Sequence, residues 1–480
     1  MSIPSHTTQA LKHFFGQDIT RVSLSQLYTL GRYLLKKKDL PNYKTFEIPT
    51  NFLYKELPIR LSQCIKGFYM GISPYSLHKI PSFHNILQGY TNDFEKLVSL
   101  PPPDNAKNDE VFMETLREMN KWHQTNLSLI NQGLRELSTA IKIGDPAIVP
   151  NYLLEDGKPN LEAASSPAIL KDGEIKWVSN YKTIKKYDID PKNNATFWNK
   201  DPTQQYAESR TIKFFEWFYS MCLGTQLLIE DQIYVRDHGK NYVRKITPFK
   251  VLEQAVGDAR KVARNYYGIE PPNVKIIAPN PNVTTVYIPH FLHSILFELL
   301  KNSLRATMDF YKDKPNSKLP DLKLIMVEGV EDLTFKVSDE GGGIPYSQVE
   351  NIWSYINKNA VSYPPHTYTN PFDSSFNLNE AVKPKNSESS EPYSHSPLFG
   401  YGIGLPTARL IARYFGGDLD VVSMEGYGSD FYLHLHRSGN VAESTPDINS
   451  MSIASASSSV SDLIDSLYDT KKSNKKTNVY

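Results

Sequence analysis

Three polar motifs follow one another in the second half of the chain, and each lies next to a predicted helix or strand. The first is a helix predicted over residues 289–311, which carries the sequence FELLKNSLR. The second, DEGGGIP at 339–345, comes directly after a predicted strand, and the third, GYGIGLP at 400–406, comes directly before a predicted helix. Further helices are predicted at 248–267 and 405–415, and strands at 274–277, 283–287, 322–328, 333–338, 419–423 and 429–436. Because strands alternate with helices around these motifs, the sequence predicts an α+β sandwich with helices on one face of a mixed sheet.

The helix of the first motif carries two kinds of side chain. Glu298, Asn302 and Arg305 stand at i, i+4 and i+7, so a carboxylate, an amide and a guanidinium share one face. Such a stripe could be a solvent-exposed, salt-bridged face. Asparagine is a mediocre helix former, however, and its neutral oxygen is a good ligand for a hard cation, which argues for a functional site. The other face is predicted to pack through Leu292, Leu296, Leu299 and Ser303.

The second motif places an aspartate at the end of a strand and three glycines close behind it. Successive glycines let a backbone approach a flat ligand that any Cβ would obstruct, and Asp339 can accept a hydrogen bond from an exocyclic amine. These properties suit adenine. Taken alone, the segment could equally be a tight turn stiffened by Pro345.

The third motif has the features of a phosphate site. Glycines at alternate positions expose successive backbone N–H groups, and the helix that follows adds the positive end of its dipole. The Pro-, Ser- and Asn-rich stretch at 363–397 is predicted to be a nucleotide lid. Neither the G-x-G-x-x-G fingerprint nor the P-loop occurs around this motif, and the V-A-I-K and H-R-D elements of ordinary protein kinases are missing.

The first half of the chain has a helical pattern. Apolar residues recur at three- and four-residue spacing over residues 23–142, and a long apolar helix is predicted from about Arg210. The proline-rich stretch between them has little helical period and is interpreted as an insertion. The expected organisation is a helical bundle at 23–245 with an insertion at about 144–209, an ATPase-like domain at 246–437 with a lid at about 358–399, and a disordered Ser/Lys-rich tail at 438–480.

Composition and charge exclude several classes of protein. The chain has 53 Lys and Arg against 52 Asp and Glu, and its net charge of +1 lacks the basic excess of nucleic-acid-binding proteins. Two cysteines, Cys64 and Cys222, cannot form a disulfide framework and suit a reducing compartment. No segment is long and apolar enough to span a bilayer. Residues 1–17 contain no Asp or Glu, so residues 1–22 are compatible with a mitochondrial presequence or with an ordinary frayed N-terminus.

In this order the three motifs resemble the GHKL ATP-binding fold, which gyrase, Hsp90, histidine kinases and mitochondrial protein kinases share. Within that superfamily, FLYKELPIRLSQCIKGF at 52–68 is similar to a helix of the pyruvate and branched-chain 2-oxo acid dehydrogenase kinases, and the chain resembles fungal members. The resemblance covers most of residues 23–437, apart from the insertion and the lid. It extends to ELLKNSLRAT (298–307), VSDEGGGIP (337–345), GYGIGLP (400–406) and SMEGYGSDFYLHL (423–435).

The resemblance implies a role for each matching residue. Glu298 would be the general base that polarises a substrate serine hydroxyl, Asn302 would bind Mg²⁺, and Asp339 would hold the amino group of adenine. The expected ATP-binding residues are Glu298, Lys301, Asn302, Arg305, Asp339, Gly341, Gly343, Lys358, Asn359, Gly400, Tyr401, Gly402, Ile403, Gly404, Leu405 and Ser429.

Three departures from the family pattern are visible. Gln232 stands where the family carries a histidine, which implies a difference in regulation. Lys358 and Asn359 replace a Ser-Thr pair before the lid, although Lys358 could still reach a phosphate as a point charge. The C-terminal Asp-Trp element that links subunits of the animal enzymes has no visible counterpart. The resemblance therefore implies a homodimer, or a heterodimer with a related kinase, but does not extend to the exchange of tails.

The implied function is a protein serine kinase of the mitochondrial matrix that uses Mg-ATP to phosphorylate, and so inhibit, the E1 alpha subunit of the pyruvate dehydrogenase complex. The bundle would contact the lipoyl domain of the E2 core. Two alternatives stay open: the branched-chain complex as substrate, and an ATP-binding regulator without phosphotransfer. A sensor histidine kinase would share the ATP domain, but His238, His290 and His293 fit poorly as phosphoacceptors.

Overall fold

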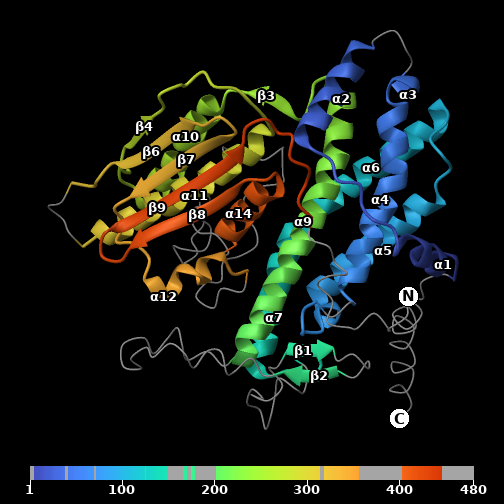
Figure 1. Cartoon of the computed structure of the whole chain (residues 1–480), viewed down its shortest axis with the longest axis horizontal. Helices are drawn as coiled ribbons and strands as arrows, with labels where there is room; N and C mark the ends of the chain where they lie inside the picture. The colour runs from blue at the N-terminus through green and yellow to red at the C-terminus, as the bar shows by residue number, and fades with distance from the viewer. Residues whose placement is uncertain are drawn as a thin grey trace, which may run out of the picture.

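The computed structural model has two domains that lie side by side, a bundle of long helices and a sheet with helices packed on it (Figure 1). The predicted fold class, a helical region followed by an α+β sandwich on a mixed sheet, is confirmed. The structure describes residues 5–37, 42–69, 72–124, 126–149, 166–169, 175–178, 202–313, 318–355 and 403–445 of the 480.

The bundle is held together by aromatic side chains and by the long helix α9. Phe68 of the segment after α4 packs edge-on against Phe214 and Phe218 of α9, with ring centroids 5.3 and 5.1 Å apart. Local signals fix the helix starts, as in α2, where Ser23 and Gln26 form a reciprocal capping box. The bundle helices are α1 (Ser5–Phe14), α2 (Leu24–Lys36), α3 (Asn42–Thr45), α4 (Glu47–Gly67), α5 (Pro81–Ser99), α6 (Ala106–His123), α7 (Asn126–Ile143) and α9 (Pro202–His238).

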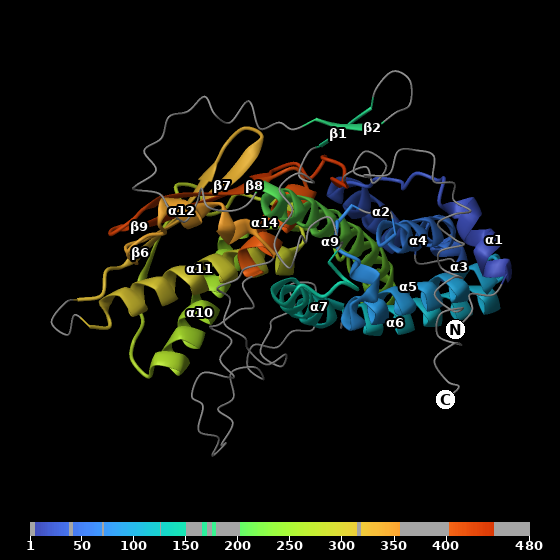
Figure 2. The ribbon, with the colours of Figure 1, turned by 90° about the horizontal axis from the view of Figure 1, so that it is seen from below.

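The second domain is a sheet with helices packed on one face (Figures 1 and 2). The strand order is β4-β6-β7-β9-β8, with β4 parallel to β6 and the other neighbours antiparallel. Side chains of β7 alternate, and Leu333, Phe335 and Val337 are fully buried in the core. The elements are α10 (Pro248–Tyr267), β4 (Val274–Ile277), α11 (Pro289–Tyr311), β6 (Leu322–Glu328), β7 (Asp332–Asp339), α14 (Gly404–Tyr414), β8 (Asp418–Met424) and β9 (Gly428–His436).

Some elements differ from the sequence-based expectation. Helix α9 begins at Pro202 and not near Arg210, because its first turns are polar and carry no apolar period. The predicted insertion contains a two-stranded hairpin, β1 (Ser166–Ile169) paired with β2 (Ile175–Val178). Strand β5 (Thr285–Tyr287) was expected, but its antiparallel partner β3 (Arg244–Ile246) was not. Strands of three or four residues give too short a pattern for periodicity to reveal.

The start of the predicted disordered tail is part of the fold. Residues 438–445, which we call the strap, run from the sheet back to the bundle, where Ala442 forms an isolated β-bridge with Ser23. Glu443 is only 1% exposed. The prediction that the chain leaves the fold at 438 is therefore wrong for these residues, because a charge that looks solvated in the sequence is buried against a partner distant along the chain. Residues 446–480 lie outside the described residues.

The N-terminal segment contributes to the core of the bundle. Helix α1 packs on α4, and Leu11 and Phe15 are buried in the main hydrophobic cluster. Gln63 and Lys66 of α4 donate hydrogen bonds to the carbonyl of Phe15. Residues 10–17 are thus built into the bundle, and a targeting role for residues 1–22 stays a prediction. Among the helices that the structure describes, none is long and apolar enough to cross a membrane.

Candidate nucleotide site

Helix α11 presents Glu298 at the centre of the candidate site. Its apolar residues, including Leu292, Leu296 and Leu299, are fully buried, which fixes the rotation of the helix. Glu298 is 9% exposed, and its Oε1 lies 2.6 Å from Nζ of Lys301, itself 3% exposed. A buried carboxylate needs such a partner, since an isolated buried charge is very costly. Lys301, one turn along the helix, therefore neutralises Glu298.

Arg305 does not join Glu298 in the way that the shared helix face suggested. Its Nε lies 3.5 Å from Oδ2 of Asp309, one turn further along α11, and its side chain is about one-third exposed. Tyr267 of α10 donates a hydrogen bond to the same carboxylate at 2.6 Å. Arg305 thus lies at the rim of the site, where a contact with ATP stays a prediction.

Asn302 lies one turn beyond Glu298 and is half-buried. Within the described ranges, no residue makes a hydrogen bond with its side chain, so its amide oxygen is available to a cation. The same ranges contain no cluster of three or more His, Cys, Asp or Glu side chains that could hold a metal by themselves. This arrangement fits Mg²⁺, which is commonly held by one or two protein ligands together with water and phosphate oxygens.

Asp339 ends β7 and faces α11. Its Oδ2 accepts a hydrogen bond from Ser303 Oγ at 2.7 Å, and its Oδ1 accepts from the backbone N–H groups of Gly341 at 3.0 Å and Ser429 at 3.3 Å. Burial raises the pKa of Asp339, although these hydrogen bonds oppose the shift. A carboxylate has about four lone-pair positions, so one acceptor position remains for a donor such as an adenine amino group.

The glycines after Asp339 are required by contacts within the protein. A β-carbon at Gly341 would lie 2.7 Å from the β-carbon of Ala306, so this residue packs directly on α11. Gly343 has φ 70°, and a β-carbon there would overlap the carbonyl of Met424 in β8. Both glycines are therefore explained by close packing, of Gly341 on α11 and of Gly343 on the sheet. Their expected position beside the base stays a prediction.

The third motif meets the first at Gly404. Helix α14 begins at this residue, and a β-carbon on it would overlap Oε2 of Glu298. The N-terminus of α14, with the positive end of its dipole, is therefore directly beside the candidate catalytic carboxylate. Ile403 is buried and Leu405 half-buried. The residues Lys358, Asn359, Gly400, Tyr401 and Gly402, and the predicted lid at 358–399, lie outside the described residues.

Two serines of the site were not recognised from the sequence as polar partners. Ser303 was assigned to the packing face of α11, but it is the residue that donates to Asp339. Ser423 of β8 accepts a hydrogen bond from the N–H of Ile344 at 2.7 Å and lies 2.9 Å from Ser429 Oγ. The position of the Ser303 hydroxyl among the apolar residues of α11 could have indicated a polar partner, because buried hydroxyl groups require one.

Gln232 lies in the bundle and not in the nucleotide site. It is buried beside Thr50 of α4 and Arg236 of α9. The guanidinium of Arg236 in turn pairs with Asp109 of α6 at 2.7 Å. The side chain thus belongs to a polar cluster that joins three bundle helices.

The three histidines considered as phosphoacceptors each contact neighbouring side chains. His293 lies 2.9 Å from Asp258 Oδ2, and His290 lies 3.1 Å from the hydroxyl of Tyr242. Burial lowers the pKa of His290 to about 3. His238 stacks on Tyr234, with ring centroids 4.4 Å apart. These contacts give each histidine a structural explanation.

Comparison with known proteins assigns both domains. Residues 21–155 match the family model described as mitochondrial branched-chain alpha-ketoacid dehydrogenase kinase. Residues 288–439 match the model of histidine kinase-, DNA gyrase B- and HSP90-like ATPases. Together the two matches span more than half of the 480 residues, and they occur in the order in which the bundle and the sheet domain occur here.

The chain belongs to the pyruvate and branched-chain 2-oxo acid dehydrogenase kinase family. It is 28% identical over 421 residues to the mitochondrial pyruvate dehydrogenase (acetyl-transferring) kinase of Arabidopsis thaliana, covering 86% of this chain and 92% of the relative. The Schizosaccharomyces pombe kinase of that name is 37% identical over 248 residues, 50% of this chain and 53% of the relative. Human isozyme 4 is 26% identical over 440 residues, 88% and 83% of the two chains.

Family membership makes the chain a kinase with an ATP-binding domain of the GHKL superfamily. The predicted family and superfamily are thereby confirmed. The ATPase match at 288–439 contains every described element of the candidate site, from α11 to β9. The bundle match at 21–155 covers α2 to α7 but does not reach α9, which contacts α14 of the second domain as well as helices of the bundle.

Proposed function

We propose that this kinase transfers the γ-phosphoryl group of ATP to a serine of the E1 alpha subunit of the pyruvate dehydrogenase complex, and so inhibits the complex. The observation that carries the proposal is the contact between Gly404 and Glu298. It brings the N-terminus of the phosphate-binding helix next to a carboxylate that can act on the substrate hydroxyl. The three relatives described above are named pyruvate dehydrogenase (acetyl-transferring) kinases, which supports the choice of complex.

Each described residue of the site has a role in this reaction. Glu298 orients the serine hydroxyl and accepts its proton, and the ion pair with Lys301 holds the carboxylate in place. Asp339, held in place by Ser303, accepts a hydrogen bond from the adenine amino group. Phosphoryl transfer depends mainly on positioning and on charge neutralisation, so side chains fixed in this way are suited to it.

Asn302 is the residue proposed to bind Mg²⁺. The Asn302 amide oxygen would hold Mg²⁺, which would supply positive charge to offset the negative charge of the transferred group. The half-buried amide with no described partner fits this role. Arg305, the glycines Gly341 and Gly343, and the segment from Gly400 to Leu405 are proposed to complete the ATP site, as are Lys358 and Asn359 before the lid.

The proposed partners follow from the family. They are the E1 alpha subunit as substrate, the lipoyl domain of the E2 core as docking partner of the bundle, and a second kinase chain in a homodimer or heterodimer. The relatives are named mitochondrial, and the matrix, where the complex would be met, is the proposed location. The branched-chain complex remains the second candidate substrate, because the bundle matches a family model named for that kinase.

The decisive experiment is phosphorylation of purified, dephosphorylated pyruvate dehydrogenase complex by this protein with Mg-ATP, with the branched-chain complex in parallel. We expect serine phosphate on E1 alpha of the pyruvate complex and loss of its activity. No incorporation into either complex would contradict the kinase proposal and favour an ATP-binding regulator. Incorporation into the branched-chain complex alone would assign the alternative substrate, and a signal that persists in Glu298→Gln would exclude Glu298 as the base.

A further inference from the structure

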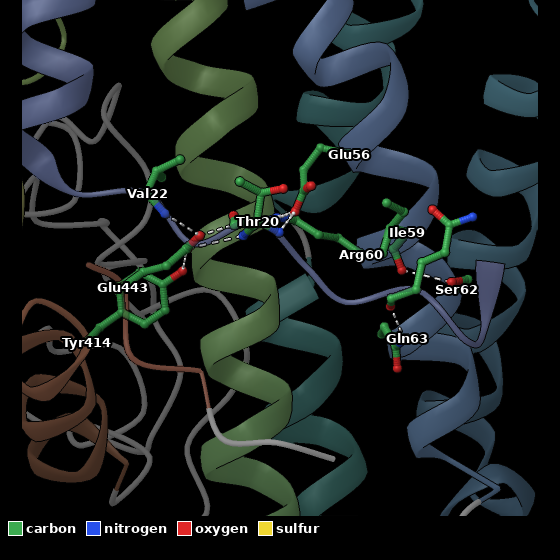
Figure 3. A network of polar contacts seen from close by, with 10 residues as sticks. Thr20, Val22, Glu56, Ile59, Arg60, Ser62, Gln63, Tyr414 and Glu443 are labelled. Atoms are coloured by element: carbon green, nitrogen blue, oxygen red, sulfur yellow. Dashed lines mark hydrogen bonds and ion pairs between the residues drawn. The ribbon is translucent and has the colours of Figure 1, made fainter. Parts of the chain in front are cut away.

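A buried polar network joins the two domains at the end of α14 remote from Gly404 (Figure 3). Arg60 of α4 is completely buried. Its Nη1 lies 3.1 Å from Oε2 of Glu443 in the strap, its Nη2 bonds Oε1 of the same carboxylate, and its Nε bonds Glu56 at 2.9 Å. Because each buried ion is costly to leave unpaired, a guanidinium bonded to two buried carboxylates holds α4 and the strap in one relative position.

The strap reaches α14 and the N-terminal segment through the same carboxylate. Oε2 of Glu443 also accepts a hydrogen bond from the hydroxyl of Tyr414, the last residue of α14, and Oε1 accepts from the N–H of Val22 at 3.1 Å. The backbone repeats these connections. The N–H of Glu443 donates to Val22 O at 2.8 Å, and the N–H of Ser444 donates to Tyr414 O at 2.9 Å.

Helix α9 closes the network from the bundle side. A β-carbon at Gly224 would overlap the hydroxyl of Tyr414 and would also meet Arg60 and Glu443. A bare backbone at this position lets the central helix approach the ion pair directly. Side chains from α4, α14 and the strap therefore pack directly against α9 at Gly224. This close packing leaves α14 little freedom to move at this end.

Tyr414 and Gly404 are the two ends of one helix. An α-helix of 11 residues is about 16 Å long and behaves as a rigid rod on this scale. Fixing its last residue against the bundle therefore also fixes its first residue against Glu298. Arg409 in the middle of α14 supports this, because it bonds Asp418 at 3.1 Å and lies 4.3 Å from the ring centroid of Trp353.

We propose that Arg60, Glu443 and Tyr414 are positioning residues for the nucleotide site, which act through α14 to set Gly404, the first residue of that helix, beside Glu298. None of them is among the residues proposed to contact the nucleotide. Coupling between two sites is reciprocal, so bound nucleotide also tightens the network and the strap. The inference rests on the proposed function, because it takes the N-terminus of α14 to face the phosphates.

The test is nucleotide affinity in Tyr414→Phe, which removes one hydroxyl and leaves the ring and the Arg60–Glu443 pair. Calorimetric titration with Mg-ADP is expected to show a dissociation constant raised about fivefold, the lower end of typical coupling between sites. Tyr287→Phe is the matched control. The Tyr287 hydroxyl is buried with no hydrogen-bond partner among the described residues, and its ring lies 5.9 Å from that of Phe415, beside the same end of α14.

Hydrogen exchange distinguishes a positioning role from a role in stability alone, because only a positioning role makes exchange near the strap depend on bound nucleotide. Mg-ADP is expected to slow exchange of the Val22 and Ser444 amides in the wild-type protein and in Tyr287→Phe, but not in Tyr414→Phe. Glu443→Gln, which keeps the shape and removes the charge, should weaken binding further. If that variant does not fold, Tyr414→Phe still decides the question.

The outcomes separate the inference from the proposed function. A lower melting temperature in Tyr414→Phe with unchanged affinity and an unchanged exchange response would overturn the inference and leave the kinase proposal intact. Wild-type protein that binds no Mg-ADP would overturn both. Loss of affinity and of the exchange response in Tyr414→Phe alone, in a protein that still phosphorylates its substrate, supports both.

Discussion

Two buried carboxylates, Asp339 in the nucleotide site and Glu443 in the strap, are held in opposite ways. Asp339 accepts three hydrogen bonds from neutral donors, and no Lys or Arg among the described residues pairs with it. Burial accordingly raises its pKa. Glu443 instead faces Arg60, and although burial by itself would lower the pKa of that guanidinium, the attraction of Glu443 raises it.

The difference separates a carboxylate kept for a ligand from one that serves the fold. A buried carboxylate without a cation retains an electrostatic and hydrogen-bonding demand that a bound amine can meet. A carboxylate already paired with a buried guanidinium has no such demand, and its removal damages the protein by leaving an uncompensated charge. Four predictions test this contrast between a functional and a structural region.

The largest effect is expected for Arg60→Ala, which leaves the Glu443 and Glu56 carboxylates buried without their cation. The free energy of unfolding should fall by about 3–5 kcal/mol, measured by chemical denaturation. Arg117→Ala is the control, because Arg117 pairs with Asp237 at 3.0 Å in an exposed position and should contribute less than about 1 kcal/mol. A similar fall in the free energy of unfolding in the two variants would show that the buried ion pair contributes no more to stability than the exposed one.

Glu298→Gln should lower the rate of phosphoryl transfer by about 100-fold, because the amide cannot accept the proton of the substrate hydroxyl. That factor corresponds to about 2.7 kcal/mol of barrier. Affinity for Mg-ADP should stay close to that of the wild-type protein, measured by calorimetry. The control is Glu253→Gln, an exposed glutamate on α10, which should phosphorylate normally. Equal activity of the two variants would exclude Glu298 as the base.

Asp339→Asn should weaken nucleotide binding by about tenfold, or about 1.4 kcal/mol, because the new amide group presents donors where the adenine amino group needs an acceptor. Its stability should change little, because the amide oxygen can take the position of Oδ1 and accept from the N–H groups of Gly341 and Ser429, while the Ser303 hydroxyl can accept from the new amide N–H. Asp332→Asn, at the exposed start of the same strand β7, is the matched control and should bind normally. A variant that binds nucleotide as the wild type does would show that Asp339 serves only the fold.

The smallest effect concerns pH. Because the pKa of Asp339 is higher in the folded than in the unfolded chain, the folded state retains the proton longer. Stability contributed by this group is therefore present at low pH and is lost as pH rises from about 4 through the folded pKa, by less than about 1.4 kcal/mol per pH unit. Over this range the free energy of unfolding of the wild type, relative to that of Asp339→Asn, should therefore fall as pH rises. An opposite slope would contradict the assignment.

The sequence alone determined the regular elements of the second domain. The helices expected at 248–267 and 289–311 have those bounds in the structure, and the strands of the main sheet agree to within about two residues. Proline at the first helical position and glycine after the last explain the agreement for α10, where Gly268 has φ 68°. Strong periodicity and local caps act over a few residues, so they are visible in one dimension.

The tertiary structure decided which polar groups meet. Helical spacing placed Arg305 on the face of Glu298, but packing paired Glu298 with Lys301 and turned Arg305 toward Asp309. Ser303 looked like a packing residue until β7 brought Asp339 to it. Side-chain pairing depends on rotamers and on neighbouring elements, which spacing along one helix does not specify.

The strap shows the same limit over a longer range. From composition, residues 438–445 belonged to a polar tail, and the sequence contains no sign that Glu443 would be buried beside Arg60. The two residues are 383 positions apart, and their pairing exists only because both domains and α9 enclose one space. Local patterns therefore defined the elements and the motifs of this kinase, whereas the partners of its buried charges were set by the packing of distant segments.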